Sequence, residues 1–180
     1  DIAAGIPQVY AATSEAFVAQ MLNLSAFCEQ MLVHEHACVA IDKEMPLDRA
    51  AVIGCAVTTG AGTIFNACKV VPGETVAVIG CGGVGLAAIN AARIAGAGKV
   101  IAIDLLEMGE IPGVSFAQMD FLDADAPEKL LAMMGGRADV VMSDMAANTT
   151  GHRKTDQLRI VGLVEAAAQF AGEVLNPGGT

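Results

Sequence analysis

The pattern of apolar and polar positions predicts alternating strands and helices after residue 72. Short apolar runs bounded by turn residues predict buried strands, and longer runs with apolar residues three or four apart predict helices. The expected strands cover residues 75–80, 99–104, 114–120 and 138–144. The expected helices cover residues 85–98, 125–136 and 155–175. This alternation predicts an α/β fold, an incomplete Rossmann-like parallel sheet with strand order 3-2-1-4 and right-handed crossovers.

The first part of the chain follows a less regular pattern. Residues 1–24 form a weakly amphipathic segment to which we assign no chemistry, and residues 29–41 alternate as a strand would. Residues 46–68 begin with a proline and an early acid and continue with small residues, which predicts a helix. We therefore expect an N-terminal helix and strand appendage over residues 1–70, followed by a nucleotide-cofactor-binding domain over residues 71–180.

The strand order leaves the expected strand 138–144 at an open edge of the sheet. An unpaired edge exposes backbone donors and acceptors to another chain. We expect that two copies of the protein could associate through this edge as a homo-oligomer.

Composition excludes several classes of protein. The chain has 180 residues, of which 54% are hydrophobic, and this excludes a disordered protein. Its net charge of −10 disfavours broad nucleic-acid binding, which needs many cations. Polar residues cut the apolar runs short of the ~20 residues of a membrane span, so we expect no membrane contact. Five cysteines without a CxxC motif favour a reduced, cytoplasmic protein.

The motif "VIGCGGVG" joins an expected strand to an expected helix and has the spacing GxGxxG. Its first glycine permits a tight turn, its second lets a pyrophosphate approach the backbone, and its third lets helix and strand pack closely. The free amides at the helix start would face phosphates. The predicted cofactor-binding residues of this turn are Gly80, Gly82, Gly83, Val84 and Gly85.

Asp104 ends the next expected strand and completes this motif. Its carboxylate would accept hydrogen bonds from both ribose hydroxyls of NAD and would repel the 2′-phosphate of NADP. The glycine turn and Asp104 together predict an NAD-type cofactor.

Residues 27–104, including "GCAVTTGAGTIFNAC" and "VPGETVAVIGCGGVGLAAINAARIAGAGKVIAID", resemble the zinc-type alcohol dehydrogenases of the medium-chain family. That resemblance implies an NAD-dependent oxidoreductase in which Thr59 and Val84 line the nicotinamide site. It matches Cys55 to the last of three protein ligands of the catalytic zinc. The segment with the other two ligands is absent, so we expect no bound zinc, impaired alcohol oxidation, and Cys55 as a small buried residue.

Residues 103–180 resemble FtsJ-like 2′-O-ribose RNA methyltransferases through "DLLEM", "MDFLD" and "DVVMSDMAANTTGH". By that resemblance Asp104 holds the ribose of S-adenosylmethionine, Asp120 binds its adenine amino group, and Asp144 is catalytic at the reacting centre. The family's catalytic lysines have no counterpart here, and Val78 stands where an acid would meet the methionine ammonium group.

The two resemblances meet near residues 99–106, which predicts a chimera joined at the second strand. Our leading hypothesis is an NAD-type binding domain resembling an alcohol dehydrogenase. The first alternative is a methyltransferase that uses S-adenosylmethionine and takes RNA as its partner. The second alternative is a non-catalytic chimeric scaffold.

Overall fold

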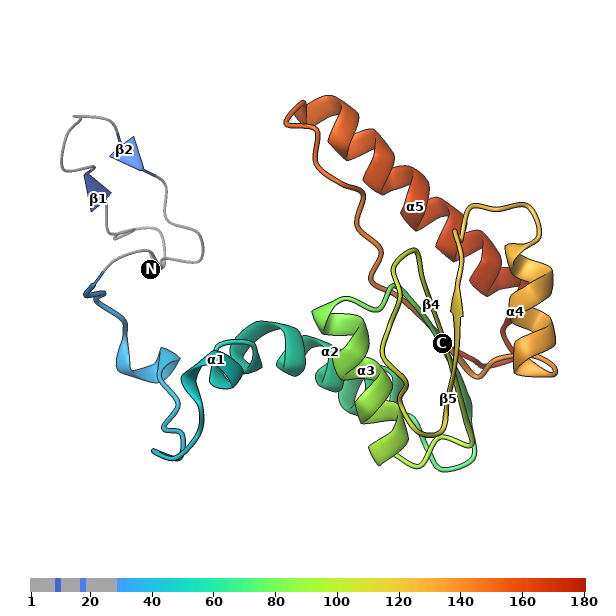
Figure 1. The fold of residues 1–180 in the computed structure, drawn as a ribbon, viewed down its shortest axis with the longest axis horizontal. Helices are drawn as coiled ribbons and strands as arrows, with labels where there is room; N and C mark the ends of the chain where they lie inside the picture. Colours follow the sequence, from blue (N-terminus) through green and yellow to red (C-terminus); the bar gives the residue numbers. More distant parts are fainter. Residues whose placement is uncertain (1–8, 11–16, 19–28) are drawn as a thin grey trace. The chain divides into compact units, whose positions relative to one another are not determined.

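The computed structural model of this protein describes residues 9–10, 17–18 and 29–180. The chain forms two compact units, residues 1–45 and residues 46–180 (Figure 1). Because the second unit contains the whole parallel sheet, it carries the candidate site.

The described residues of the first unit form three short elements. Strands β1 (Val9–Tyr10) and β2 (Phe17–Val18) pair antiparallel, and η1 (Glu35–Ala37) is a single 3-10 turn. The expected strand over residues 29–41 is wrong, because the backbone there bonds to itself: the Ala37 amide donates to the His34 carbonyl at 2.9 Å. Apart from β1 and β2, the amphipathic segment 1–24 lies outside the described residues.

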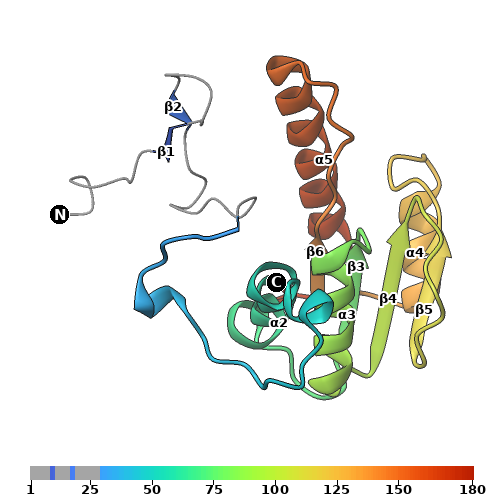
Figure 2. The ribbon, with the colours of Figure 1, turned by 60° about the vertical axis from the view of Figure 1, so that its left-hand side comes forward.

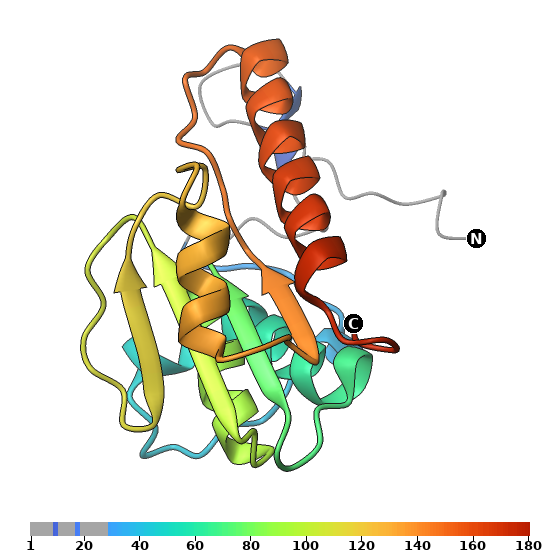
Figure 3. The same ribbon diagram turned by 90° about the vertical axis from the view of Figure 1, so that its right-hand side faces the viewer.

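The sheet of the second unit has four parallel strands, as the sequence predicts. They are β3 (Thr75–Ile79), β4 (Lys99–Asp104), β5 (Val114–Gln118) and β6 (Val140–Ser143). Their order is β5-β4-β3-β6, which confirms the predicted order 3-2-1-4 (Figure 3). Val76 pairs with Val100 on one side and with Val140 on the other, so β3 is central and buried.

Helices cover both faces of this sheet. Figure 3 shows α4 (Ala126–Met134) and α5 (Arg153–Val174) on one face, with α3 (Gly83–Ile94) on the other. Strand residues alternate between the two faces and therefore build two cores. The core beside α3 includes Val76, Val78, Ile89 and Val100. The core beside α4 and α5 includes Ile79, Ile101, Ile103, Leu130 and Phe170.

The expected helix over residues 46–68 forms as a run of short turns. It comprises α1 (Leu47–Ala50), the π-helical η2 (Ile53–Val57), α2 (Thr58–Gly62) and the π-helical η3 (Thr63–Cys68). Figure 2 shows α2 alongside α3. Their backbones approach closely, since a Cβ on Gly60 would overlap the carbonyl oxygen of Val84.

This helical run belongs to the same compact unit as the sheet, while the domain boundary expected near residue 70 stays a prediction. Its 22 residues, Leu47–Cys68, have the length and apolar composition of a membrane span, contrary to the expectation that polar residues keep every apolar run too short. Its Ile64 is fully buried in the core beside α3.

The outer edge of β6 is partly covered by the end of the chain. The Thr180 amide donates to the Asp139 carbonyl at 2.9 Å, and the Thr180 carbonyl accepts from the Val141 amide at 2.9 Å. Helix α5 extends beyond the sheet, so that Leu158 is 72% and Val164 60% exposed. Association of two copies through this edge stays a prediction.

Candidate functional site

The carboxyl ends of the strands open into a cavity of about 650 Å³. The cavity lies where the strand order reverses between β3 and β6, the usual ligand position in an open α/β sheet. Its volume is typical of small-molecule sites, which span roughly 300–1,000 Å³. The cavity is lined by residues at the carboxyl end of each strand, by the loop after β6 and by helix α5. Its polar and glycine lining residues are Gly80, Gly82, Asp104, Asp120, Asp144, Asn148, Arg159 and Gly162.

The glycine turn between β3 and α3 forms one wall of the cavity. Gly80 has a φ of +95°, and a Cβ there would lie 2.9 Å from the carbonyl oxygen of Asp144. Gly82 lines the cavity, and no atom lies within 4 Å of where its Cβ would stand. A Cβ on Gly85 would overlap the carbonyl oxygen of Gly80. Each glycine of the motif therefore has the geometry that its expected task requires.

Asp104 is held against this turn by backbone amides. Its Oδ2 accepts from the Cys81 amide at 2.6 Å, and its Oδ1 accepts from the Leu106 amide at 2.8 Å. Its own carbonyl accepts from the Met119 amide at 2.9 Å. Each carboxylate oxygen can accept a further hydrogen bond, so Asp104 can still receive two ribose hydroxyls.

The Cys81 thiol lies beside this carboxylate. Burial, and then the negative charge of Asp104, raise the pKa of the Cys81 thiol to about 11. The thiol also lies 3.4 Å from the Ile103 carbonyl oxygen, to which it donates. The thiol is therefore neutral at physiological pH, and it packs against the core beside α3.

Asp120 lies at the end of β5, in a tight turn. Its Oδ1 accepts from the Leu122 amide at 2.9 Å. The intervening Phe121 is buried and contacts Phe170 of α5 edge to face, with ring centroids 5.5 Å apart. This aromatic contact attaches the turn that contains Asp120 to helix α5.

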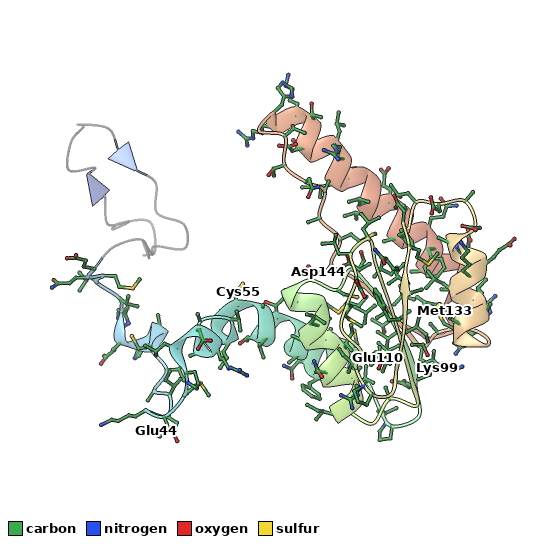
Figure 4. All side chains as sticks on the ribbon, in the orientation of Figure 1. Glu44, Cys55, Lys99, Glu110, Met133 and Asp144 are labelled. Atoms are coloured by element: carbon green, nitrogen blue, oxygen red, sulfur yellow. The ribbon has the colours of Figure 1, made fainter. Side chains whose placement is uncertain are left out.

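Asp144 follows β6 and has an exposed carboxylate at the mouth of the cavity (Figure 4). Its amide donates to the Ile79 carbonyl at 2.9 Å, which fixes it beside the glycine turn. Helix α5 then starts at its N-cap His152, whose ring nitrogen accepts from the Thr155 amide. The loop between them is held by Arg159, whose Nη1 donates to the Asn148 carbonyl at 3.0 Å.

Several expected site residues lie away from the cavity. Gly83, Val84 and Gly85 are in the first turn of α3 but do not line it, and neither does Thr59, which is exposed on α2. Cys55 is exposed rather than buried, because the helical run around it has little covering it; Figure 4 shows it on a different element from Asp144. In the part of the chain that the structure describes, no group of three His, Cys, Asp or Glu side chains could hold a metal.

Sequence reasoning missed Phe121, Asn148 and Arg159 as lining residues. The run "GHRKTDQLR" has a local excess of cations, but such a pattern is typical of a solvated loop and helix start and does not indicate a site. The helix period could have shown that Arg159 shares a face with Leu163 and Phe170, since these residues are spaced by four and seven.

The parallel sheet, the glycine turn and the acid-lined cavity define a Rossmann-like α/β domain with a cavity at the carboxyl ends of its strands. The sequence profile of the FtsJ-like methyltransferases matches residues 62–180. The chain therefore belongs to the FtsJ-like methyltransferase family.

Curated relatives agree with this assignment. The protein named ribosomal RNA large subunit methyltransferase E from Bradyrhizobium sp. is 73% identical over 112 residues, which are 61% of this chain and 48% of the relative. The protein of the same name from Afipia carboxidovorans is 73% identical over 111 residues, which are 60% of this chain and 49% of the relative. The chain spans about half the length of these relatives.

Solved structures of both a methyltransferase and a dehydrogenase share the fold of this chain. A Plasmodium falciparum protein described as a ribosomal RNA methyltransferase has a TM-score of 0.59 at 22% identity, covering 69% of this chain and 73% of that one. An alcohol dehydrogenase zinc-binding domain protein from Burkholderia ambifaria has a TM-score of 0.56 at 26% identity, covering 77% and 34%.

The leading hypothesis of an NAD-type, dehydrogenase-like function is wrong. The family match begins at residue 62 and so includes the glycine turn, which the sequence analysis assigned to a dehydrogenase. Both families place adenosine over the same strand ends, so a glycine turn and a following acid cannot separate them. The chimeric junction near residues 99–106 stays a prediction.

Proposed function

We propose that this chain carries the S-adenosylmethionine site and the reacting aspartate of a 2′-O-ribose methyltransferase acting on large-subunit ribosomal RNA. The observation that supports it most is the convergence of Asp104, Asp120 and Asp144 on one cavity from three different strands. The names of the curated relatives support the choice of ribosomal RNA. The free cysteines among the described residues fit the expected cytoplasmic location.

The cavity fits the adenosine end of the cofactor. Open space at Gly82 lets a ligand approach the backbone, and Asp104 retains acceptor capacity for ribose hydroxyls. Asp120 stands at the next strand end, where its carboxylate can accept from the adenine amino group. Val78 is buried in the core beside α3, so at that position no carboxylate meets the ammonium group of the methionine end.

When bound, S-adenosylmethionine would supply a methyl group to a ribose 2′-oxygen: its S–CH3 bond would break to leave S-adenosylhomocysteine, and the hydroxyl proton would pass to solvent. The exposed Asp144 carboxylate accepts a hydrogen bond from that hydroxyl and orients its oxygen toward the cavity. The bond from the Asp144 amide to Ile79 keeps this carboxylate next to the glycine turn. Leu105 and Leu122, both exposed at the mouth, give the adenine apolar surface and displace water.

Calorimetric titration with S-adenosylhomocysteine tests the cofactor site. We expect saturable binding to the wild-type chain and weakening of about 10- to 100-fold in Asp120→Ala, because a hydrogen bond to a charged group contributes about 1.5–3 kcal/mol. Asp123→Ala is the matched control, since Asp123 is exposed and does not line the cavity.

Two outcomes contradict the proposal. One is no binding of S-adenosylhomocysteine by the folded wild-type chain, which would favour the scaffold hypothesis. The other is equal binding by Asp120→Ala and the wild type. Methylation of large-subunit RNA by the chain, lost in Asp144→Asn with cofactor binding retained, would extend the test to the reaction.

A further inference from the structure

Helix α5 carries a cluster of cations beside the cavity. Arg159 is the one cation that lines the cavity in the described part of the chain, against the three carboxylates of Asp104, Asp120 and Asp144. Arg153 and Lys154 are exposed in the first turn of the same helix. We call these three cations the basic end of α5. It stands out in a chain whose net charge is −10.

Arg159 is oriented by the chain without being neutralised. Its Nη1 donates to the Asn148 carbonyl at 3.0 Å, which uses one of the five donors of a guanidinium. The remaining donors are held next to the loop that starts at Asp144. A planar guanidinium in a fixed orientation suits the oxygens of a phosphate.

Nearby acidic side chains within residues 29–180 form no ion pairs with these cations, which therefore stay free to bind an anion. Among the residues that the structure describes, the single ion pair joins Lys129 to Asp125, so the basic end of α5 forms none. Asp156 lies on the same turn, but its carboxylate accepts from Thr150 at 2.8 and 2.7 Å. Hydrogen bonds from the backbone amide and then the hydroxyl of Thr150 lower the pKa of Asp156, and the charge of Arg159 has a smaller effect in the same direction.

The helix itself adds to the positive potential. The first turn of an α-helix carries unpaired amides and a partial positive charge, and Arg153 and Lys154 lie in that turn. A polyanion that reaches Asp144 therefore finds cations on the α5 side, whereas the glycine turn and β4 present the carboxylate of Asp104.

We infer that Arg159 binds an RNA phosphate adjacent to the ribose at Asp144, and that Arg153 and Lys154 bind further phosphates along the same strand. This inference rests on the proposed function and names the surface through which the RNA enters. The carboxylate of S-adenosylmethionine is also an oxyanion that a guanidinium could bind, so the experiment must separate the two.

The experiment measures binding of a labelled single-stranded RNA oligonucleotide by fluorescence anisotropy over a series of salt concentrations. Each phosphate contact to a single strand contributes about 0.7 to the slope of log affinity against log salt. We expect Arg159→Gln to reduce the slope by about 0.7 and the double variant Arg153→Gln, Lys154→Gln by about 1.4. Arg93→Gln on α3 is the control with the same charge change away from the cavity, and it should keep the wild-type slope.

Calorimetry with S-adenosylhomocysteine on the same variants separates the two oxyanions. We expect Arg159→Gln to bind it as the wild type does. A loss of this binding with an unchanged RNA slope would assign Arg159 to the cofactor carboxylate and overturn the inference. Failure of the wild type to bind S-adenosylhomocysteine would instead count against the proposed function.

The remaining outcomes also decide the inference. Equal slopes for Arg159→Gln and Arg93→Gln would show that RNA binding depends on the net charge of the protein and not on a contact by Arg159. Absence of RNA binding by the wild type would show that the basic end of α5 is not an RNA-binding surface. Arg159→Lys keeps the charge, so it should keep the slope. If Arg159→Gln melts below the assay temperature by circular dichroism, the double variant in the exposed first turn carries the test.

Discussion

Asp104 at the end of β4 accepts a hydrogen bond of 2.6 Å from the amide of Cys81 in the glycine turn, 23 residues earlier in the chain. This bond joins two neighbouring strand ends and aims the carboxylate at the cavity. The acid therefore has two tasks: it holds the turn, and it offers its remaining lone pairs to a ligand.

Replacing Asp104 with Asn should weaken the cofactor site without unfolding the sheet. The amide keeps one oxygen for the Cys81 or Leu106 amide but loses the charge that strengthens both hydrogen bonds. We expect binding of S-adenosylhomocysteine to fall about 10- to 100-fold by calorimetry. Glu107→Gln, an exposed acid three residues later, is the control, and equal affinities for the two variants would contradict a role of Asp104 in binding.

Gly85→Ala should destabilise the fold. Its Cβ would overlap the Gly80 carbonyl oxygen, and backbone cannot move aside as a flexible side chain can. Overpacking of this kind costs about 1–3 kcal/mol, visible as a lower urea midpoint. Gly172→Ala in α5 meets no atom within 4 Å and should instead raise stability by about 0.5–1 kcal/mol. A wild-type midpoint for Gly85→Ala would show that the turn relaxes freely.

Cys81 should make the fold sensitive to alkaline pH. Its thiol pKa rises from 9.0 to about 11 through burial and the charge of Asp104. The folded state therefore holds the thiol proton more tightly than the unfolded state. The resulting stability is fully present below pH 9 and is lost as pH rises toward about 11.

Urea midpoints measured across this pH range check the prediction. Cys81→Ala should flatten the alkaline decline, while Cys55→Ala, which removes an exposed thiol, should leave it as in the wild type. Alkylation of Cys81 by iodoacetamide, followed by mass spectrometry, should accelerate only as pH approaches about 11. Rapid alkylation at neutral pH would contradict the raised pKa.

Asp139 should contribute stability that is lost in acid. Its Oδ2 accepts from the Thr75 amide at 2.8 Å and its Oδ1 from the Asn176 side chain at 2.7 Å, and these bonds lower the pKa of Asp139. The contribution is present above the ordinary value of 3.8 and disappears as pH falls through the lower folded value.

Asp139→Ala should lower the stability at neutral pH by ~1 kcal/mol, because two hydrogen bonds at the start of β3 and after α5 are lost. Urea denaturation at neutral pH and at pH near 3 measures both parts of this prediction. Asp123→Ala removes an exposed acid and serves as the control. Identical profiles of stability against pH for the two variants would show that the hydrogen bonds of Asp139 do not stabilise the fold in solution.

The sequence by itself determined the four strands and three helices that follow residue 72, and the order of the sheet. The apolar run of β4 ends at Asp104 as expected, and the GxGxxG spacing predicted the turn between β3 and α3. These features follow from local periodicity and from the handedness of crossover connections, both of which are present in a short window of residues.

Only the tertiary structure decided which side chains meet. Asp120 and Asp144 approach Asp104 because β5 and β6 flank the two central strands, and Arg159 joins them because α5 crosses back over the cavity. The alternating residues 29–41 do not form a strand, since strand formation needs a partner that no local pattern supplies. Contacts between residues far apart in the chain depend on packing, and packing is a property of the whole fold.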